Sequence, residues 1–236
     1  MFPEIFAREQ EVGIGLPEQI REIVPPKDRL DRATSFLREA GKYSLREEDA
    51  VNLVAGGNVL HGVRLQNLLS EFEVMLTQDL PGSDWQAFFA KNMLTLNPGY
   101  IKAIPKANIA PVTGELPDFL LISVEGYVDV YEVKLPGTVL LNYDGGRHNY
   151  YWSSDIAKAI SQTENYISTL SSNKYVLERN IQEKYKIKLT ILRPREYVIA
   201  GKSSQLQDTQ ECDYFRLLKE SLRNTRIVPY DALRHG

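Results

Sequence analysis

The sequence predicts an α/β (α+β) fold organised around an apolar β-hairpin. Two runs of strand-forming residues, 119–124 and 128–133, are separated by Glu125-Gly126, which is the pattern of a β-hairpin. Helical periodicity precedes this hairpin, and an amphipathic helix over residues 155–170 follows it.

Composition indicates a soluble globular protein of one or two domains, since the 236 residues are 43% hydrophobic and 25% charged. The formal net charge of -3 means that any contact with nucleic acid must come from a local basic patch. The single cysteine, Cys212, excludes an internal disulfide and fits a cytoplasmic protein. No apolar run approaches the length of a membrane span, so we expect no membrane partner.

Residues 1–80 are predicted to form a helical extension. Candidate helices cover residues 16–24 and 28–40, a third begins at a capping box over residues 44–47, and a longer one begins at Asn58. The extension carries no recognisable chemistry. It either binds a partner or regulates the rest of the chain, or it is a packing extension, which we favour. Pro81-Gly82 marks the predicted boundary with a second domain over residues 81–236.

The second domain is predicted to begin with a helix over residues 84–94, capped by Ser83, and a strand over residues 100–109. After the hairpin, residues 137–152 are predicted to form a polar loop that matches no phosphate-loop pattern, so no nucleotide cofactor is expected. The remaining predicted elements are the helix over residues 155–170, capped by Ser153 or Ser154, a helix over 175–187, short strands over 189–192 and 197–200, and a helix over 209–222.

Three charged residues interrupt the apolar hairpin: Asp118, Glu132 and Lys134. A hairpin folded about residue 126 places Asp118 opposite Lys134 and diagonal to Glu132, with all of them on one face. This register requires an odd-numbered turn or a bulge, because a strict two-residue turn would move Asp118 to the other face. Two carboxylates about 4 Å apart repel by roughly 4 kcal/mol at an effective dielectric constant near 20. Either one carboxylate is protonated or a cation lies between them.

This combination of charges suits phosphodiester hydrolysis. Mg²⁺ is commonly held by one or two carboxylates, with open positions for phosphate oxygens. A lysine beside the metal can hold or deprotonate a water molecule. The alternative is a surface hairpin with alternating charge, which needs no metal.

Polar residues elsewhere are candidates for contacts with the same substrate. Gln162 and Tyr166 lie one helical turn apart on a polar stripe, so both can point at one site. Candidate contacts with nucleic-acid phosphates are the basic residues of the loop, of the polar stripe and of the most basic segment: Arg147, His148, Lys158, Lys188, Arg193, Arg195 and Lys202. A solvated surface position is the alternative for each of them.

The order of these elements and motifs resembles the PD-(D/E)XK nuclease superfamily, with Pro117-Asp118 and Glu132-Val133-Lys134 as the motif. Gln162-Thr163-Glu164-Asn165-Tyr166 is similar to the Q-x-x-x-Y element of its RecB-like branch. Residues 81–236 resemble more closely the Shedu family of anti-phage defence proteins. The segments that carry this resemblance are 85–89, 117–121, 130–136, 151–156, 159–162, 199–202 and 228–233.

The resemblance implies a restriction-endonuclease-like core, with a mixed central sheet flanked by helices. It also implies a Mg²⁺-dependent DNA endonuclease that acts against phage DNA as a homo-oligomer, with Mn²⁺ as a substitute metal. It implies that Asp118 and Glu132 bind the metal and that Lys134 positions or activates the attacking water. Gln162 would orient the metal-bound water or the scissile phosphate, and Tyr166 would support Gln162. The alternatives are a recombination or repair nuclease of the RecB-like type and a catalytically inactive DNA-binding relative.

One departure from the nuclease pattern is visible in the sequence. Related nucleases often carry a glutamate on the first core helix, facing the metal. The nearest acidic residue here is Asp84, between Ser83 and Trp85, and it is assigned no role.

Overall fold

The computed structural model describes residues 64–110 and 116–234. Residues 64–76 are helical, which confirms the described part of the helix predicted from Asn58. The other helices predicted in the N-terminal extension lie outside the described residues. Residues 73–236 form one compact unit, which contains the predicted central hairpin. None of the described helices combines the length and the apolar composition that crossing a membrane would require.

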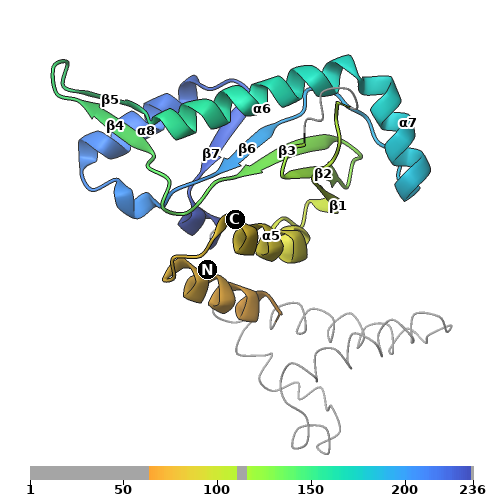
Figure 1. The fold of residues 1–236 in the computed structure, drawn as a ribbon, viewed down its shortest axis with the longest axis horizontal. Coiled ribbons are helices and arrows are strands. Elements are labelled where there is room, and N and C mark those ends of the chain that lie inside the picture. Colours follow the sequence, from red (N-terminus) through yellow and green to blue (C-terminus); the bar gives the residue numbers. More distant parts are fainter. Residues whose placement is uncertain (1–63, 111–115, 235–236) are drawn as a thin grey trace, which may run out of the picture. The chain divides into compact units, whose positions relative to one another are not determined.

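A mixed five-stranded sheet forms the centre of the unit, with the order β1-β2-β3-β6-β7 (Figure 1). Its strands are β1 (Tyr100–Pro105), β2 (Phe119–Ser123), β3 (Val128–Val133), β6 (Glu196–Ile199) and β7 (Thr225–Val228). The first three strands pair antiparallel, whereas β6 lies parallel to β3 and β7 parallel to β6. This arrangement confirms the predicted mixed sheet.

Helices cover the two faces of this sheet (Figure 1). They are α5 (Gly82–Leu96), α6 (Ser154–Ser172), α7 (Lys174–Tyr185) and α8 (Thr209–Ser221), with short 3₁₀ helices η1 (Ser203–Gln205) and η2 (Tyr230–Arg234). The face under α6 and α7 is apolar, since inward side chains of β2 and β3 pack against Tyr166, Leu170 and Leu177. On α5, Trp85 and Phe89 pack against the ring of Tyr230, with centroid distances of 4.8 and 5.9 Å.

The hairpin β2–β3 has a different register from the predicted one. Its turn contains the three residues 124–126, with Gly126 at its last position in the left-handed conformation (φ 85°). The predicted odd-numbered turn is therefore confirmed, but the hairpin folds about residue 125 and not 126. Phe119 pairs with Tyr131, so the next pair outward brings Asp118 opposite Glu132 instead of Lys134.

Residues 137–152, predicted as a polar loop, contain a second hairpin of β4 (Leu141–Asp144) and β5 (Asn149–Trp152). The loop prediction was wrong because the aromatic residues of this stretch are strand formers with a surface to pack on. Trp152 packs edge-on against Phe215 of α8 at 5.7 Å, and Tyr150 lies 5.7 Å from Tyr214 of the same helix.

Three smaller predictions also need correction. Helix α5 begins at Gly82 after Pro81, and Ser83 lies inside its first turn, where its hydroxyl bonds Asp84 instead of capping the helix. Strand β1 ends at Pro105, because the chain turns sharply at Lys106. The predicted strand over residues 189–192 is reduced to a single bridge between Tyr127 and Thr190. By contrast, Ser153 caps α6 as predicted, accepting from the Ile156 N–H at 3.2 Å.

Gly201, which follows β6, gives a test of the packing beside the sheet. Its φ is 65°, and a Cβ there would lie 2.6 Å from Leu140 Cδ2 and 2.8 Å from the Thr138 carbonyl oxygen. We expect Gly201→Ala to lower the free energy of unfolding by at least about 2 kcal/mol, through backbone strain and overpacking. Urea denaturation measures this. The control is Gly99→Ala, since a Cβ at Gly99 meets no atom within 4 Å; equal losses in the two variants would contradict the expectation.

Candidate active site

Asp118 and Glu132 form a buried pair of carboxylates at the open end of the β2–β3 hairpin. Their residues are only 4% and 5% exposed. Asp118 directly precedes β2, and its Oδ2 accepts a hydrogen bond from the Val133 N–H at 2.8 Å, so the side chain continues the ladder between the strands. The hairpin register alone therefore brings these residues together.

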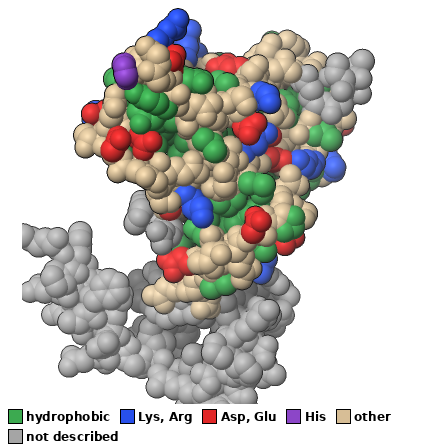
Figure 2. Space-filling model, turned by 60° about the vertical axis from the view of Figure 1, so that its left-hand side comes forward, with side chains coloured by type: hydrophobic (Ala, Val, Ile, Leu, Met, Phe, Trp, Pro, Cys, Tyr) green, Lys and Arg blue, Asp and Glu red, His purple; other side chains and the backbone are tan. Residues whose placement is uncertain are grey.

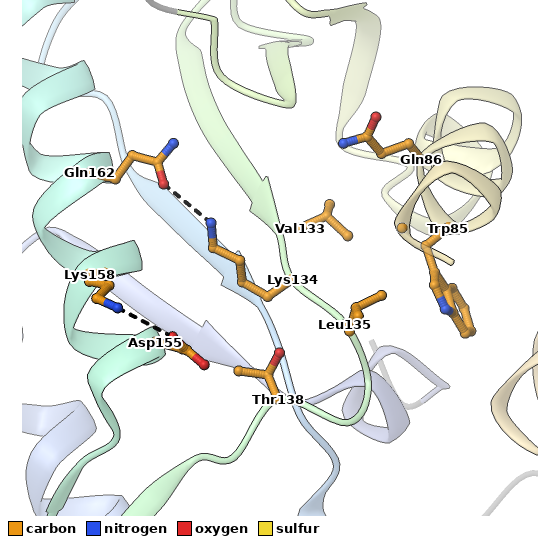
Figure 3. Close-up of a pocket in the computed structure, with 10 residues that line it drawn as sticks. Trp85, Gln86, Val133, Lys134, Leu135, Thr138, Asp155, Lys158 and Gln162 are labelled. Carbon is orange, nitrogen blue, oxygen red and sulfur yellow. Dashed lines mark hydrogen bonds and ion pairs between the residues drawn. The ribbon is translucent and has the colours of Figure 1, made fainter. Parts of the chain in front are cut away.

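Two residues that the sequence analysis did not assign to the site bind the other oxygen of Asp118. The Gln86 amide donates to Oδ1 at 3.0 Å, and the Lys106 ammonium forms an ion pair with the same atom. Gln86 projects from α5 (Figure 3). The signal for Gln86 was its place inside the aromatic segment 85–89, where it is the one residue with a polar side chain.

Lys134 connects Glu132 to α6. Its ammonium donates to Glu132 Oε1 at 2.8 Å and to Gln162 Oε1 at 3.2 Å, and Figure 3 shows it extending from the end of β3 toward Gln162. The Gln162 Nε2 in turn donates to the Tyr166 hydroxyl at 2.6 Å. On the backbone side, the Tyr230 hydroxyl donates to the Lys134 carbonyl oxygen at 2.6 Å. The structure thus links Glu132, Lys134, Gln162 and Tyr166 in one chain of hydrogen bonds, beside Asp118.

Burial dominates the electrostatics of the pair. It raises the pKa of Glu132 above its ordinary value, and the nearby charge of Asp118 raises it further, whereas Lys134 opposes the shift. Lys134 and Lys106 therefore offset the effect of burial on Glu132 only in part.

This donor set fits a hard divalent cation. The described residues contain no cluster of three or more His, Cys, Asp or Glu side chains that could hold a metal ion. A pair of carboxylates nevertheless suits Mg²⁺, which retains waters and takes further oxygen ligands from a substrate phosphate. The incomplete compensation of Glu132 is an independent indication, because a cation would favour its charged form.

A pocket of about 440 Å³ opens beside this site (Figure 3). It lies between α5, the segment after β3, and α6, and it is lined by Gly82, Trp85, Gln86, Val133, Lys134, Leu135, Thr138, Asp155, Lys158 and Gln162. Lys134 and Gln162 therefore face a space that a substrate can enter. Lys158 stands beside the same space, paired with Asp155 at 3.8 Å across an exposed turn of α6.

The predicted DNA-binding residues are dispersed over the unit. Of these residues, Lys158 lines the pocket. Arg147 and His148 lie in the β4–β5 turn, and His148 Nδ1 is 2.9 Å from the Tyr143 hydroxyl. The Arg195 guanidinium binds the buried carboxylate of Asp129 at 2.7 Å. Lys188 and Arg193 are exposed, and the Lys202 ammonium donates to a backbone carbonyl at 3.3 Å. In the view of Figure 2, basic side chains lie scattered among acidic and apolar ones.

The raised pKa of Glu132 gives a pH test. The folded state holds a proton on Glu132 more tightly than the unfolded chain does, so the parent loses stability as pH rises from about 4.5 through the folded pKa. Because glutamine does not titrate, Glu132→Gln should gain stability over the metal-free parent as pH rises. Urea denaturation in EDTA at about pH 4 and about pH 8 measures this difference. Glu125→Gln, in the exposed turn, is the control. A stability gain of Glu132→Gln that shrinks toward high pH would contradict the raised pKa of Glu132.

Comparison with known proteins agrees with the motifs around this site. The family model described as Shedu protein SduA, C-terminal, matches residues 79–233. The chain is also 25% identical over 229 residues to the Shedu protein SduA of Bacillus cereus (strain B4264), covering 92% of this chain and 58% of that protein. The chain thus spans little more than half the length of this relative. Since the family model covers well over half of its residues, the chain belongs to the Shedu family.

Proposed function

We propose that this Shedu protein is a divalent-metal-dependent deoxyribonuclease that acts in anti-phage defence. The observation that carries the nuclease proposal is the buried pair of Asp118 and Glu132, with Lys134 joining Glu132 to Gln162 beside a pocket. Burying two adjacent carboxylates at the end of an apolar hairpin costs free energy, and groups perturbed in this way cluster at functional sites. Membership of the Shedu family supports the defence role.

Asp118 and Glu132 are the residues that would hold Mg²⁺, or Mn²⁺ in its place. When bound, the metal supplies Lewis-acid activation of a phosphate oxygen and of a water molecule. Asp118 is prepared for this role because Gln86, Lys106 and the Val133 N–H all donate to its carboxylate oxygens. Its two oxygens are thereby fixed in orientation before any ligand arrives.

Lys134 orients the attacking water through its ammonium and opposes the negative charge that develops on the phosphate. To act as a general base it must first give up a proton, after which its amine can take one from that water. Lys134 is placed for these roles because its ammonium already faces the pocket between Glu132 and Gln162. The Lys134 carbonyl is fixed by Tyr230, so the base of the side chain has a defined position.

Gln162 acts as a hydrogen-bond acceptor at the site. A lysine ammonium can only donate, so the Gln162 atom that faces Lys134 must be its oxygen, and its nitrogen faces Tyr166. A hydrogen-bond acceptor orients a water molecule by accepting a hydrogen bond from its O–H group. It would repel a phosphate oxygen, which is also an acceptor. Of the two roles implied by the resemblance, we therefore propose the water-orienting one for Gln162, with Tyr166 as the residue that holds the amide in place.

DNA binding completes the proposal. Lys158 is placed to contact a phosphate next to the scissile one, because it lines the pocket. Arg147, His148, Lys188 and Arg193 would contact the backbone further away, since the net charge of -3 leaves such contacts to local basic residues. We also propose that the protein assembles as a homo-oligomer.

The direct test is incubation of the purified chain with linear, nicked and circular DNA in Mg²⁺, in Mn²⁺ and in EDTA. We expect cleavage with either metal and none in EDTA, because the proposed role of the carboxylate pair is to hold the metal that activates the water and the phosphate. Gel electrophoresis reads out the products and shows which DNA form is cut. Cleavage at full rate in EDTA would rule out the metal assignment.

A second test separates Lys134 from the carboxylates. Lys134→Ala should keep metal binding and lose cleavage by at least about 100-fold, a typical loss for an acid–base group. Asp118→Ala and Asp118→Asn should lose both, since a carboxylate oxygen is needed to bind the cation. Single-turnover cleavage and calorimetric metal binding measure the two effects.

The matched control is Lys91→Ala, which removes an exposed lysine of α5. The assignment fails if Lys134→Ala cuts DNA at the parental rate. It fails equally if that variant abolishes metal binding as Asp118→Ala does.

A further inference from the structure

Lys106 is a cation of the site whose one role in the proposed function is its ion pair with Asp118. It directly follows β1, and its backbone is left-handed, with φ at 47°. Its N–H donates to the Asp118 carbonyl oxygen at 3.0 Å, and its ammonium pairs with Oδ1 of the same residue. Lys106 is therefore bound to Asp118 twice, through the main chain and through the side chain.

The backbone of Lys106 is unusual for its residue type. A left-handed conformation is strained for a residue with a Cβ, and glycine, asparagine or aspartate adopts it more readily. A lysine side chain is too long to offset the strain by bonding its own backbone. Such strain recurs at functional positions, where the surrounding structure holds it. Here it accompanies a sharp turn after β1 that brings the ammonium to a buried carboxylate.

Each carboxylate of the pair has an ammonium of its own: Asp118 pairs with Lys106, and Glu132 with Lys134. A divalent cation at the pair would repel both ammonium groups. Lys106 is the one that can leave, since its side chain is 48% exposed, against 29% for Lys134. Among the described residues it pairs with Asp118 alone, whereas Lys134 also bonds Gln162.

We propose that Lys106 is the resident counter-ion of Asp118, that a divalent cation displaces it, and that the released ammonium then binds a phosphate group of the DNA. This inference rests on the proposed function of the site. Without DNA, the ion pair weakens metal binding, because the cation must break it. With DNA, the metal ion and the nucleic acid bind cooperatively, since each favours the state in which Lys106 has left Asp118.

The experiment is calorimetric titration of the full chain with Ca²⁺, with and without a short DNA duplex that a gel shows to stay intact. For the parent, we expect the duplex to tighten Ca²⁺ binding about 10-fold, a typical coupling between sites. Lys106→Met removes the charge and keeps much of the length. It should bind Ca²⁺ about 10-fold more tightly than the parent without DNA, and the duplex should add little.

Two further variants control for misfolding at position 106 and for the loss of a positive charge anywhere on the protein. Lys106→Asn removes the same charge and tolerates the left-handed backbone, so it should behave as Lys106→Met does. Lys102→Met removes a lysine from β1, the strand that precedes Lys106; the Lys102 ammonium lies 4.9 Å from the centre of the Tyr185 ring. It should leave both the Ca²⁺ affinity and its dependence on DNA as in the parent.

The outcomes separate this inference from the function on which it rests. If the parent binds Ca²⁺ and neither Lys106 variant binds it more tightly, the counter-ion role is wrong and the nuclease proposal stands. An equal gain in Lys102→Met would show that general charge, and not the ion pair, sets the affinity, which also defeats the inference. A parent that binds neither Ca²⁺ nor Mg²⁺, with or without DNA, overturns the proposed function and this inference together.

Discussion

The three-residue turn at residues 124–126 determines which residues face one another at the far end of the β2–β3 hairpin. Gly126 takes the left-handed conformation there, and the register that follows places Asp118 opposite Glu132. A change of one residue in the turn would move Asp118 to the other face of the sheet. The pairing of the carboxylates, and the chemistry proposed for them, therefore depends on a turn several residues away.

The site is completed by elements that are distant in sequence. Gln86 comes from α5, Lys106 from the end of β1, and Gln162 from α6, while β3 supplies the centre. These elements meet because helices pack on both faces of the sheet. Burial then makes each donor necessary, since a carboxylate shielded from water depends on protein groups for its hydrogen bonds. The fold thus buries two adjacent carboxylates, and Lys106 and Lys134 offset part of the cost of that burial.

Two other buried carboxylates show what distinguishes the candidate site. Asp129 is bound by Arg195 at 2.7 Å and by the Tyr100 hydroxyl at 2.5 Å, so a guanidinium matches its charge. Glu196 accepts from the Thr225 hydroxyl at 2.6 Å, and burial raises its pKa. These partners do not line the pocket, whereas the pocket residues Lys134 and Gln86 bind Glu132 and Asp118. A pair of carboxylates, lysines and an adjoining pocket occur together at Asp118 and Glu132, which is why we assign the chemistry there.

The sequence by itself determined most of the helices and strands and the residues that we propose for the site, because these follow from local patterns. Two runs of strand formers around a turn predicted the hairpin, helical periodicity predicted α6, and the motifs gave Asp118, Glu132, Lys134, Gln162 and Tyr166 as candidates. The tertiary structure decided the register, the second hairpin, the place of Gln86 and Lys106, and the partner of Arg195. These depend on turn conformation and on contacts between distant segments. A local pattern carries no information on such contacts, since their energy comes from partners that only folding brings together.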